Sequence, residues 1–88
     1  MESKTRFISL NIGMKSNLAG LLTILGNQAI DIAFLQEVKV TDAEMENKVG
    51  RLGYQSKVNI NQEDLSKPGT AIVWRSTLPV RDVTSLVL

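Results

Sequence analysis

The run Ile30-Asp31-Ile32-Ala33-Phe34-Leu35-Gln36-Glu37 decides the fold class of this 88-residue chain. From Ile30 to Gln36 it is short, mostly apolar and rich in β-branched and aromatic side chains, which predicts a buried strand. An earlier run of the same character, Arg-Phe-Ile-Ser-Leu-Asn-Ile over residues 6–12, predicts another buried strand, which Gly13 ends. Two such strands favour parallel pairing if a helix joins them.

The residues between the two runs have the spacing of that connecting helix. One helical face is formed by leucines at the i, i+3, i+4 and i+7 positions, namely Leu18, Leu21, Leu22 and Leu25. Ser16 or Asn17 stands where a capping side chain is expected, and Gly26-Asn27 supplies a stop. The first part of the chain therefore predicts a β-α-β unit.

A second helix is predicted to begin at Thr41 or Asp42 and to end at Gly53. Glu44 follows Thr41 by three residues, which is the spacing of a capping box, and a glycine is typical of a helix end. The apolar residues of this stretch recur at about helical spacing; they are Met45, Val49 and Leu52.

The remaining residues read as strands around one polar loop. Residues 54–60 alternate between apolar and polar side chains, which predicts a strand, and the polar, turn-rich residues 61–68 predict a loop. Residues 69–74 and 80–88 predict two further strands. The expected order is β-α-β-α-β-β-β in one α/β domain. Because the chain stops within apolar residues, we expect residues 1–88 to be the N-terminal part of a larger domain.

The amino-acid composition excludes several kinds of functional site and partner. The chain contains no cysteine and no histidine, which removes disulfides, thiolate metal sites and the commonest general base. Its net charge of +1 lacks the strongly basic footprint of an autonomous nucleic-acid binder. No apolar stretch of the sequence approaches the roughly 20 residues of a membrane span. We expect an intracellular protein, nuclear or cytoplasmic, without a membrane partner.

Polar side chains stand at the ends of the first two predicted strands. Asn11 interrupts the first apolar run, and Glu37 follows directly on the second. The carboxyl ends of parallel strands gather at one edge of a sheet, where ligands usually bind, so these two side chains are expected to lie close together. A carboxylate beside an amide oxygen suits a hard cation such as Mg²⁺. The structural alternative is a solvated Glu37 in a turn and an Asn11 that satisfies a backbone group.

Three segments resemble the endonuclease/exonuclease/phosphatase superfamily. The first, FISLNI over residues 7–12, is similar to a first strand that an asparagine ends. The second, DIAFLQE over residues 31–37, resembles a hydrophobic strand that ends in Gln-Glu. The third combines Gly53-Tyr54 with PGTAIVW over residues 68–74. Their order and separations are compatible with the superfamily. Within it, the sequences of these segments most resemble the endonucleases of non-LTR (LINE-type) retrotransposons.

The resemblance implies a fold and an activity. The fold is the first half of a four-layered α/β sandwich of the DNase-like kind, and the activity is magnesium-dependent cleavage of phosphate esters, with Mn²⁺ as an alternative ion. It implies Glu37 as a metal ligand and Asn11 as a neighbouring catalytic residue. The partner of the complete enzyme would be DNA, nicked by an endonuclease-reverse transcriptase polyprotein to prime reverse transcription.

The sequence also departs from the superfamily pattern. Many relatives carry a second Asn or Asp where this chain has Gly13. The later motifs, a catalytic Asp with its neighbouring Asn and a terminal Asp-His pair, are absent from these 88 residues. We therefore expect the chain by itself to be inactive.

Two other interpretations stay open at this stage. One is a small non-catalytic α/β interaction module or dimerising remnant, and uncovered apolar strands would make it, like the enzyme fragment, a homo-oligomer. The other is a flavodoxin-like ligand binder, which the absence of a glycine-rich phosphate loop after the first strand disfavours.

Overall fold

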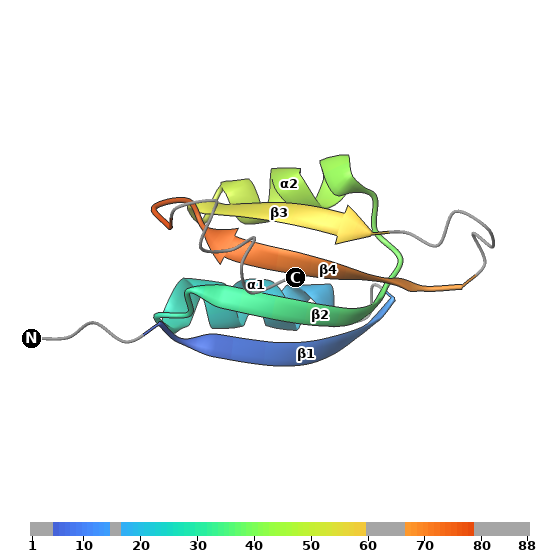
Figure 1. Ribbon diagram of the computed structural model, residues 1–88, viewed down its shortest axis with the longest axis horizontal. Coiled ribbons are helices and arrows are strands. Elements are labelled where there is room, and N and C mark those ends of the chain that lie inside the picture. The colour runs from blue at the N-terminus through green and yellow to red at the C-terminus, as the bar shows by residue number, and fades with distance from the viewer. Residues whose placement is uncertain (1–4, 15–16, 60–66, 79–88) are drawn as a thin grey trace, which may run out of the picture.

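The computed structural model describes residues 5–14, 17–59 and 67–78. Over these residues the elements are β1 (Phe7–Met14), α1 (Leu18–Asn27), β2 (Ile32–Val38), α2 (Asp42–Gly50), β3 (Tyr54–Asn59) and β4 (Gly69–Arg75). They form a small mixed α/β domain with one four-stranded sheet and two helices (Figure 1). The α/β class and the first six elements of the predicted order are confirmed, whereas the strand predicted over residues 80–88 lies outside the described residues.

The strands lie in the order β1-β2-β4-β3. β1 and β2 are parallel neighbours, as predicted from the helix that joins them, with Phe7 opposite Ile32 and Asn11 opposite Gln36. β4 is antiparallel both to β2 and to β3, so it lies between them although it comes last among the described strands. The carboxyl ends of β1 and β2 therefore meet at one edge of the sheet, beside the start of β4.

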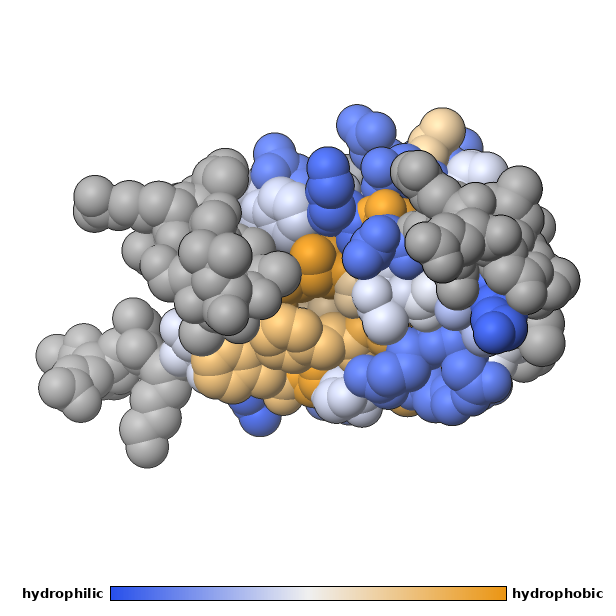
Figure 2. All heavy atoms as spheres, turned by 45° about the vertical axis from the view of Figure 1, so that its right-hand side comes forward, coloured by the Kyte–Doolittle hydropathy of each residue, from blue (hydrophilic) through white to orange (hydrophobic). Residues whose placement is uncertain are grey.

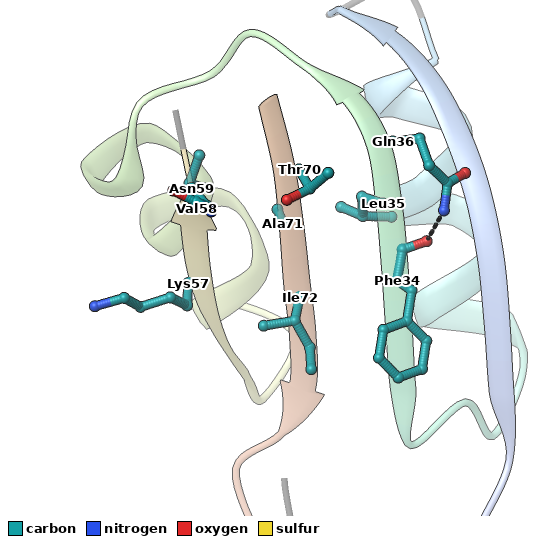
Figure 3. Close-up of a pocket in the computed structure, with 9 residues that line it drawn as sticks. All are labelled: Phe34, Leu35, Gln36, Lys57, Val58, Asn59, Thr70, Ala71 and Ile72. Carbon is teal, nitrogen blue, oxygen red and sulfur yellow. Dashed lines mark hydrogen bonds between the residues drawn. The ribbon is translucent and has the colours of Figure 1, made fainter. Parts of the chain in front are cut away.

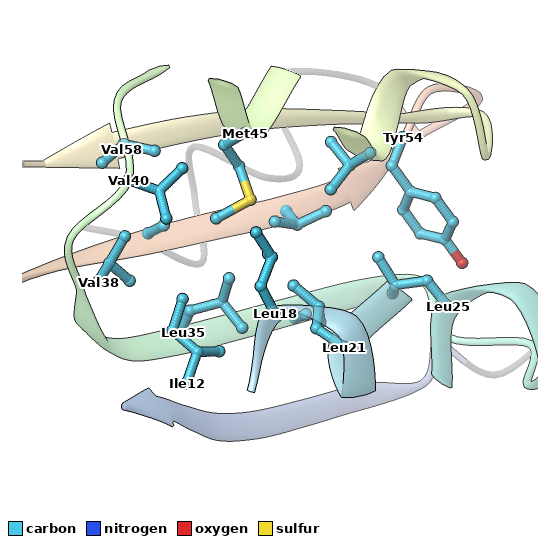
Figure 4. Packing of buried hydrophobic residues seen from close by; sticks show 14 of the residues in the cluster. Ile12, Leu18, Leu21, Leu25, Leu35, Val38, Val40, Met45, Tyr54 and Val58 are labelled. Carbon is cyan, nitrogen blue, oxygen red and sulfur yellow. The ribbon is translucent and has the colours of Figure 1, made fainter. Parts of the chain in front are cut away.

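Both helices contribute to one core on a single face of the sheet. Leu18, Leu21 and Leu25 of α1 point into this core together with Met45 of α2 (Figure 4). Ala33 and Leu35 of β2 and Ala71 and Val73 of β4 supply its floor, and all four are buried. The predicted leucine face of α1 is thus confirmed at these three leucines, whereas Leu22, also predicted on it, is only partly buried.

The other face of the sheet carries no helix among the described residues, although many of its side chains are apolar. Alternate residues of β2 and β4 point to this side because side chains alternate along a strand. Phe34, Ile72 and Trp74 are only partly buried here, and Phe7 is 51% exposed and stacks near Phe34 at 6.3 Å between ring centroids. A band of apolar side chains between polar ones is visible on this side of the molecule in Figure 2. We call this surface the open face.

The predicted cap of α2 is confirmed, and its predicted end is wrong. The Thr41 hydroxyl accepts a hydrogen bond from the backbone N–H of Glu44 at 3.1 Å. The helix ends at Gly50, three residues before Gly53, because residues 51–53 form a turn that closes on a left-handed Gly53 with φ of +85°. Leu52 consequently lies beyond the helix and is 38% exposed, rather than part of its buried face.

The bounds of β2 also differ from the prediction. The strand begins at Ile32 rather than at Ile30, whose carbonyl accepts hydrogen bonds from the side chains of Tyr54 and Arg75. It continues through Glu37 to Val38, so Glu37 lies within the strand and not in a turn after it. None of the helices in the described part of the chain combines the length and the apolar character needed to cross a bilayer.

Candidate active site

Asn11 and Glu37 meet at the carboxyl edge of the two parallel strands. The side-chain amide nitrogen of Asn11 on β1 donates a hydrogen bond to Glu37 Oε2 on β2. Both residues are exposed, so the pair lies open to solvent. The expected proximity of these two predicted site residues is confirmed, and it arises because parallel neighbours bring their carboxyl ends to the same edge.

The backbone at this pair is irregular on both strands. Glu37 has a left-handed φ of +52°. Among the described residues, it is the only residue other than glycine with a positive φ. Gln36 pairs with Thr70 and Val38 pairs with Gly69, so Glu37 is an extra residue that bulges from the ladder with β4. A left-handed conformation costs a non-glycine residue roughly 1–2 kcal/mol. Such strain is typical of functional sites, where a side chain must leave the regular alternation of the strand.

The hydrogen bonds of Asn11 determine which end of its amide faces Glu37. The backbone N–H of Gly13 donates to Asn11 Oδ1 at 2.8 Å, and this contact requires an oxygen because an N–H can only donate. The nitrogen end of the amide is thereby directed at the Glu37 carboxylate. β1 continues through Gly13 to Met14, so Gly13 does not end the strand as predicted; its φ of +53° falls in the irregular stretch after Asn11, where glycine has no side chain to clash. Asn11 thus orients the carboxylate with its donor end, while its oxygen is already engaged.

Glu37 has the donor atoms that a hard cation needs, but few of them. Among the described residues, Asn11 is the only hydrogen-bond donor to its carboxylate, and that bond is made to Oε2. The described part of the chain contains no group of three or more His, Cys, Asp or Glu side chains that could hold a metal ion. Mg²⁺ commonly takes one or two protein carboxylates and completes its shell with water and phosphate oxygens. A single carboxylate fits that habit, and Gly13 adds no second side-chain ligand.

A hollow on the open face begins beside this pair. It has a volume of about 560 Å³ and is lined by side chains of β2, β4 and β3 (Figure 3). Phe34 and Ile72 line its apolar part, and Lys57 stands at its edge as a cation. Its polar end is formed by three residues that pair across the sheet. Thr70 of β4 lies between Gln36 of β2 and Asn59 of β3 and pairs with both.

Sequence reasoning missed this polar row. Gln36 is held in place because its amide nitrogen donates to Ser9 Oγ at 2.7 Å and to the Phe34 carbonyl at 3.3 Å. The sequence does show a polar residue near one end of each of these strands. The three residues become neighbours only because β4 lies between β2 and β3, which the sequence does not indicate.

The opposite end of the sheet carries a second cluster of polar side chains. Asp31 accepts hydrogen bonds from the backbone N–H of Arg6 at 2.9 Å and from Arg75 Nε at 3.3 Å. The Ile30 carbonyl accepts from the Tyr54 hydroxyl at 2.5 Å and from Arg75 Nη2 at 3.1 Å. Burial raises the pKa of the Tyr54 phenol, and the Arg75 guanidinium, 5.2 Å from the centre of its ring, partly opposes that rise. These groups link the ends of β1, β2, β3 and β4, and each Asp31 carboxylate oxygen accepts a hydrogen bond.

Comparison of the chain with protein-family models, with curated proteins and with solved structures finds no match.

Proposed function

We propose that this chain is the N-terminal part of a magnesium-dependent endonuclease domain of the endonuclease/exonuclease/phosphatase type, which nicks DNA. The parent protein of this proposal is a retrotransposon polyprotein that also carries a reverse transcriptase. The single observation that carries the proposal is the contact between Asn11 and a left-handed Glu37 at the parallel edge of the sheet. A strained, oriented and solvent-accessible carboxylate is costly to maintain and serves no packing purpose.

Glu37 would hold the metal ion through its carboxylate, and Asn11 would keep that carboxylate in one orientation. Bound there, Mg²⁺ or Mn²⁺ would stabilise negative charge on the phosphoryl oxygens and on the leaving group. The chain has no histidine and so lacks the usual group for accepting a proton from water. In this proposal the rest of the domain supplies that group, and the 88 residues alone do not catalyse.

The finer fold that we propose is the first half of a four-layered α/β sandwich. One face of the sheet is covered by α1 and α2, whereas the open face exposes Phe7 and leaves Phe34, Ile72 and Trp74 partly uncovered. Sheets of a sandwich pack with such faces against each other, about 10 Å apart. The open face is therefore the surface that a second sheet of the complete domain would cover.

Titration of the chain with Mn²⁺, followed by NMR, tests the proposal. Paramagnetic broadening is expected first at the resonances of Asn11 and Glu37. Glu37→Gln is expected to abolish it, because the substitution removes the charged ligand and keeps the shape of the side chain. Glu46→Gln provides the matched control, since Glu46 is an exposed acid on α2. Broadening confined to α2, or unchanged by Glu37→Gln, would exclude Glu37 as the metal ligand.

A second candidate function is a non-catalytic module that self-associates, and the open face is the observation that favours it. An uncovered apolar sheet face can be buried against a second copy of the chain. Sedimentation over a range of concentrations is expected to show self-association, and Phe34→Lys should weaken it. Self-association combined with no response of Glu37 to metal would favour this module over the endonuclease. A monomer at all concentrations would exclude it.

A further inference from the structure

Asn17 occupies the N-cap position of α1 but does not cap the helix. Its side chain makes no hydrogen bond to the first turn, in contrast to Thr41, which caps α2. Asparagine is among the strongest capping residues, so a helix that begins at an uncapped asparagine forgoes stabilisation that the residue could provide. The side chain of Asn17 is directed elsewhere.

That side chain is bound to the backbone of the candidate active site. Asn17 Nδ2 donates to the carbonyl oxygen of Asn11 at 3.2 Å, and the Asn17 backbone N–H donates to the carbonyl oxygen of Ile12 at 3.0 Å. Asn17 is itself attached to the helix, because its carbonyl accepts from the backbone N–H of Leu21 at 3.0 Å. One residue thus links the first turn of α1 to the end of β1.

The hydrogen bonds continue from Asn11 to Glu37. The backbone carbonyl of Asn11 accepts a hydrogen bond from Asn17, and its side-chain oxygen accepts one from Gly13. Its side-chain nitrogen in turn donates to the Glu37 carboxylate. The backbone of Asn11 is therefore held by Asn17, and its side-chain amide is held at the oxygen by Gly13 and at the nitrogen by Glu37. A metal ligand whose orientation is set by hydrogen-bonded neighbours typically binds more tightly than one that is free to rotate.

We infer that Asn17 is a positioning residue, which acts through Asn11 to hold the Glu37 carboxylate in its metal-binding orientation. This inference rests on the proposed function for its consequence in metal binding. The contact between Asn17 and Asn11 does not depend on that function and can be tested separately.

Asn17→Ser separates positioning from stability. Serine caps helices about as well as asparagine, but its side chain is one atom shorter and does not reach the carbonyl of Asn11. The expected result is a shift of the Asn11 side-chain amide resonances and a loss of Mn²⁺ affinity at Glu37 of up to roughly 10-fold. The midpoint of urea unfolding should stay at the wild-type value or rise. Asn47→Ser, the same change at an exposed residue of α2, should alter neither the resonances nor the affinity.

Unchanged Asn11 resonances in Asn17→Ser would overturn the inference, and so would shifted resonances with wild-type Mn²⁺ affinity. If the wild-type chain shows no Mn²⁺ effect at Glu37, the proposed function fails on its own. In that case the positioning role of Asn17 is still tested by the Asn11 amide resonances and the side-chain carboxyl resonance of Glu37. Their joint shift in Asn17→Ser supports the positioning role, and their constancy overturns it.

Discussion

The two ends of the sheet differ in how they bind a carboxylate, as a comparison of Asp31 with Glu37 shows. At the amino end of β2, both oxygens of Asp31 accept hydrogen bonds, one from the Arg6 backbone and one from Arg75. At the carboxyl end of the same strand, Glu37 is exposed, and within the described residues it accepts one hydrogen bond, from Asn11. Asp31 has an unstrained backbone, whereas Glu37 is held left-handed. The Asp31 carboxylate, with a hydrogen bond at each oxygen, links strand ends, whereas the strained and exposed Glu37 carboxylate is the one to which we assign a ligand in the proposed function.

The largest expected difference between the two ends is catalytic. In a polypeptide that contains the whole proposed endonuclease domain, Glu37→Ala is expected to lower DNA nicking by roughly 10²-fold or more, about 3 kcal/mol of transition-state stabilisation. Its free energy of unfolding should change little, because the side chain of Glu37 is exposed. Supercoiled-plasmid nicking measured beside urea unfolding tests both statements. Nicking at the wild-type rate would remove Glu37 from the active site.

At the other end, Asp31→Asn is expected to lower the free energy of unfolding by about 1–2 kcal/mol. The variant keeps the shape of the side chain, but it replaces a charged acceptor of two hydrogen bonds with a neutral amide. The estimate is modest because the Arg75 and Asp31 side chains are 35% and 22% exposed, and solvent screens their attraction. The response of Glu37 to Mn²⁺ should stay at the wild-type level. A variant as stable as the wild type would show that this cluster does not hold the strands together.

The buried phenol of Tyr54 makes the same end sensitive to alkaline pH. Its pKa is raised by burial above the ordinary value of 10.0, so the folded state binds the phenolic proton more tightly than the unfolded state does. This contribution to stability is fully present below pH 10.0 and is lost as the pH rises through the folded-state pKa. Tyr54→Phe should be less stable than the wild type by about 1 kcal/mol at neutral pH, because it loses the hydrogen bond to Ile30.

Urea unfolding of both proteins on either side of pH 10.0 measures this difference. The stability gap between wild type and Tyr54→Phe should close as the pH rises. Because Tyr54 is the only tyrosine of the sequence, its ionisation can be followed by absorbance without interference from another phenol. A gap that does not depend on pH would show that the phenol is not protected by burial.

The smallest expected effect concerns the strain at Glu37. Glu37→Gly should be more stable than Glu37→Ala by less than about 1 kcal/mol, since glycine adopts a positive φ without steric cost but loses more entropy on folding. A matched pair at Asp31, Asp31→Gly and Asp31→Ala, should show the reverse order because its φ is not positive. Equal stabilities at position 37 would mean that no strain is stored at the bulge.

The sequence by itself determined the α/β class, the order of the first six elements and the buried face of α1, and for α2 it identified Met45 and Val49 but not the end of the helix. Hydrophobic periodicity reports directly which side of a helix or strand is buried, and the leucines of α1 and the Thr41 cap of α2 are local features. The pairing of Asn11 with Glu37 was also predictable, because a helix that joins two buried strands makes them parallel and brings their ends together.

Tertiary structure alone decided where β4 lies and how Glu37 is presented. Periodicity does not say which strands become neighbours, so the insertion of β4 between β2 and β3, and the polar row that it completes, had no local signal. Glutamate has no intrinsic preference for a left-handed backbone, and the bulge arises from the unequal register of β2 with its two neighbours. The sequence likewise suggested Asn17 as a helix cap, whereas the fold directs its side chain to Asn11, because the end of β1 offers a carbonyl within reach.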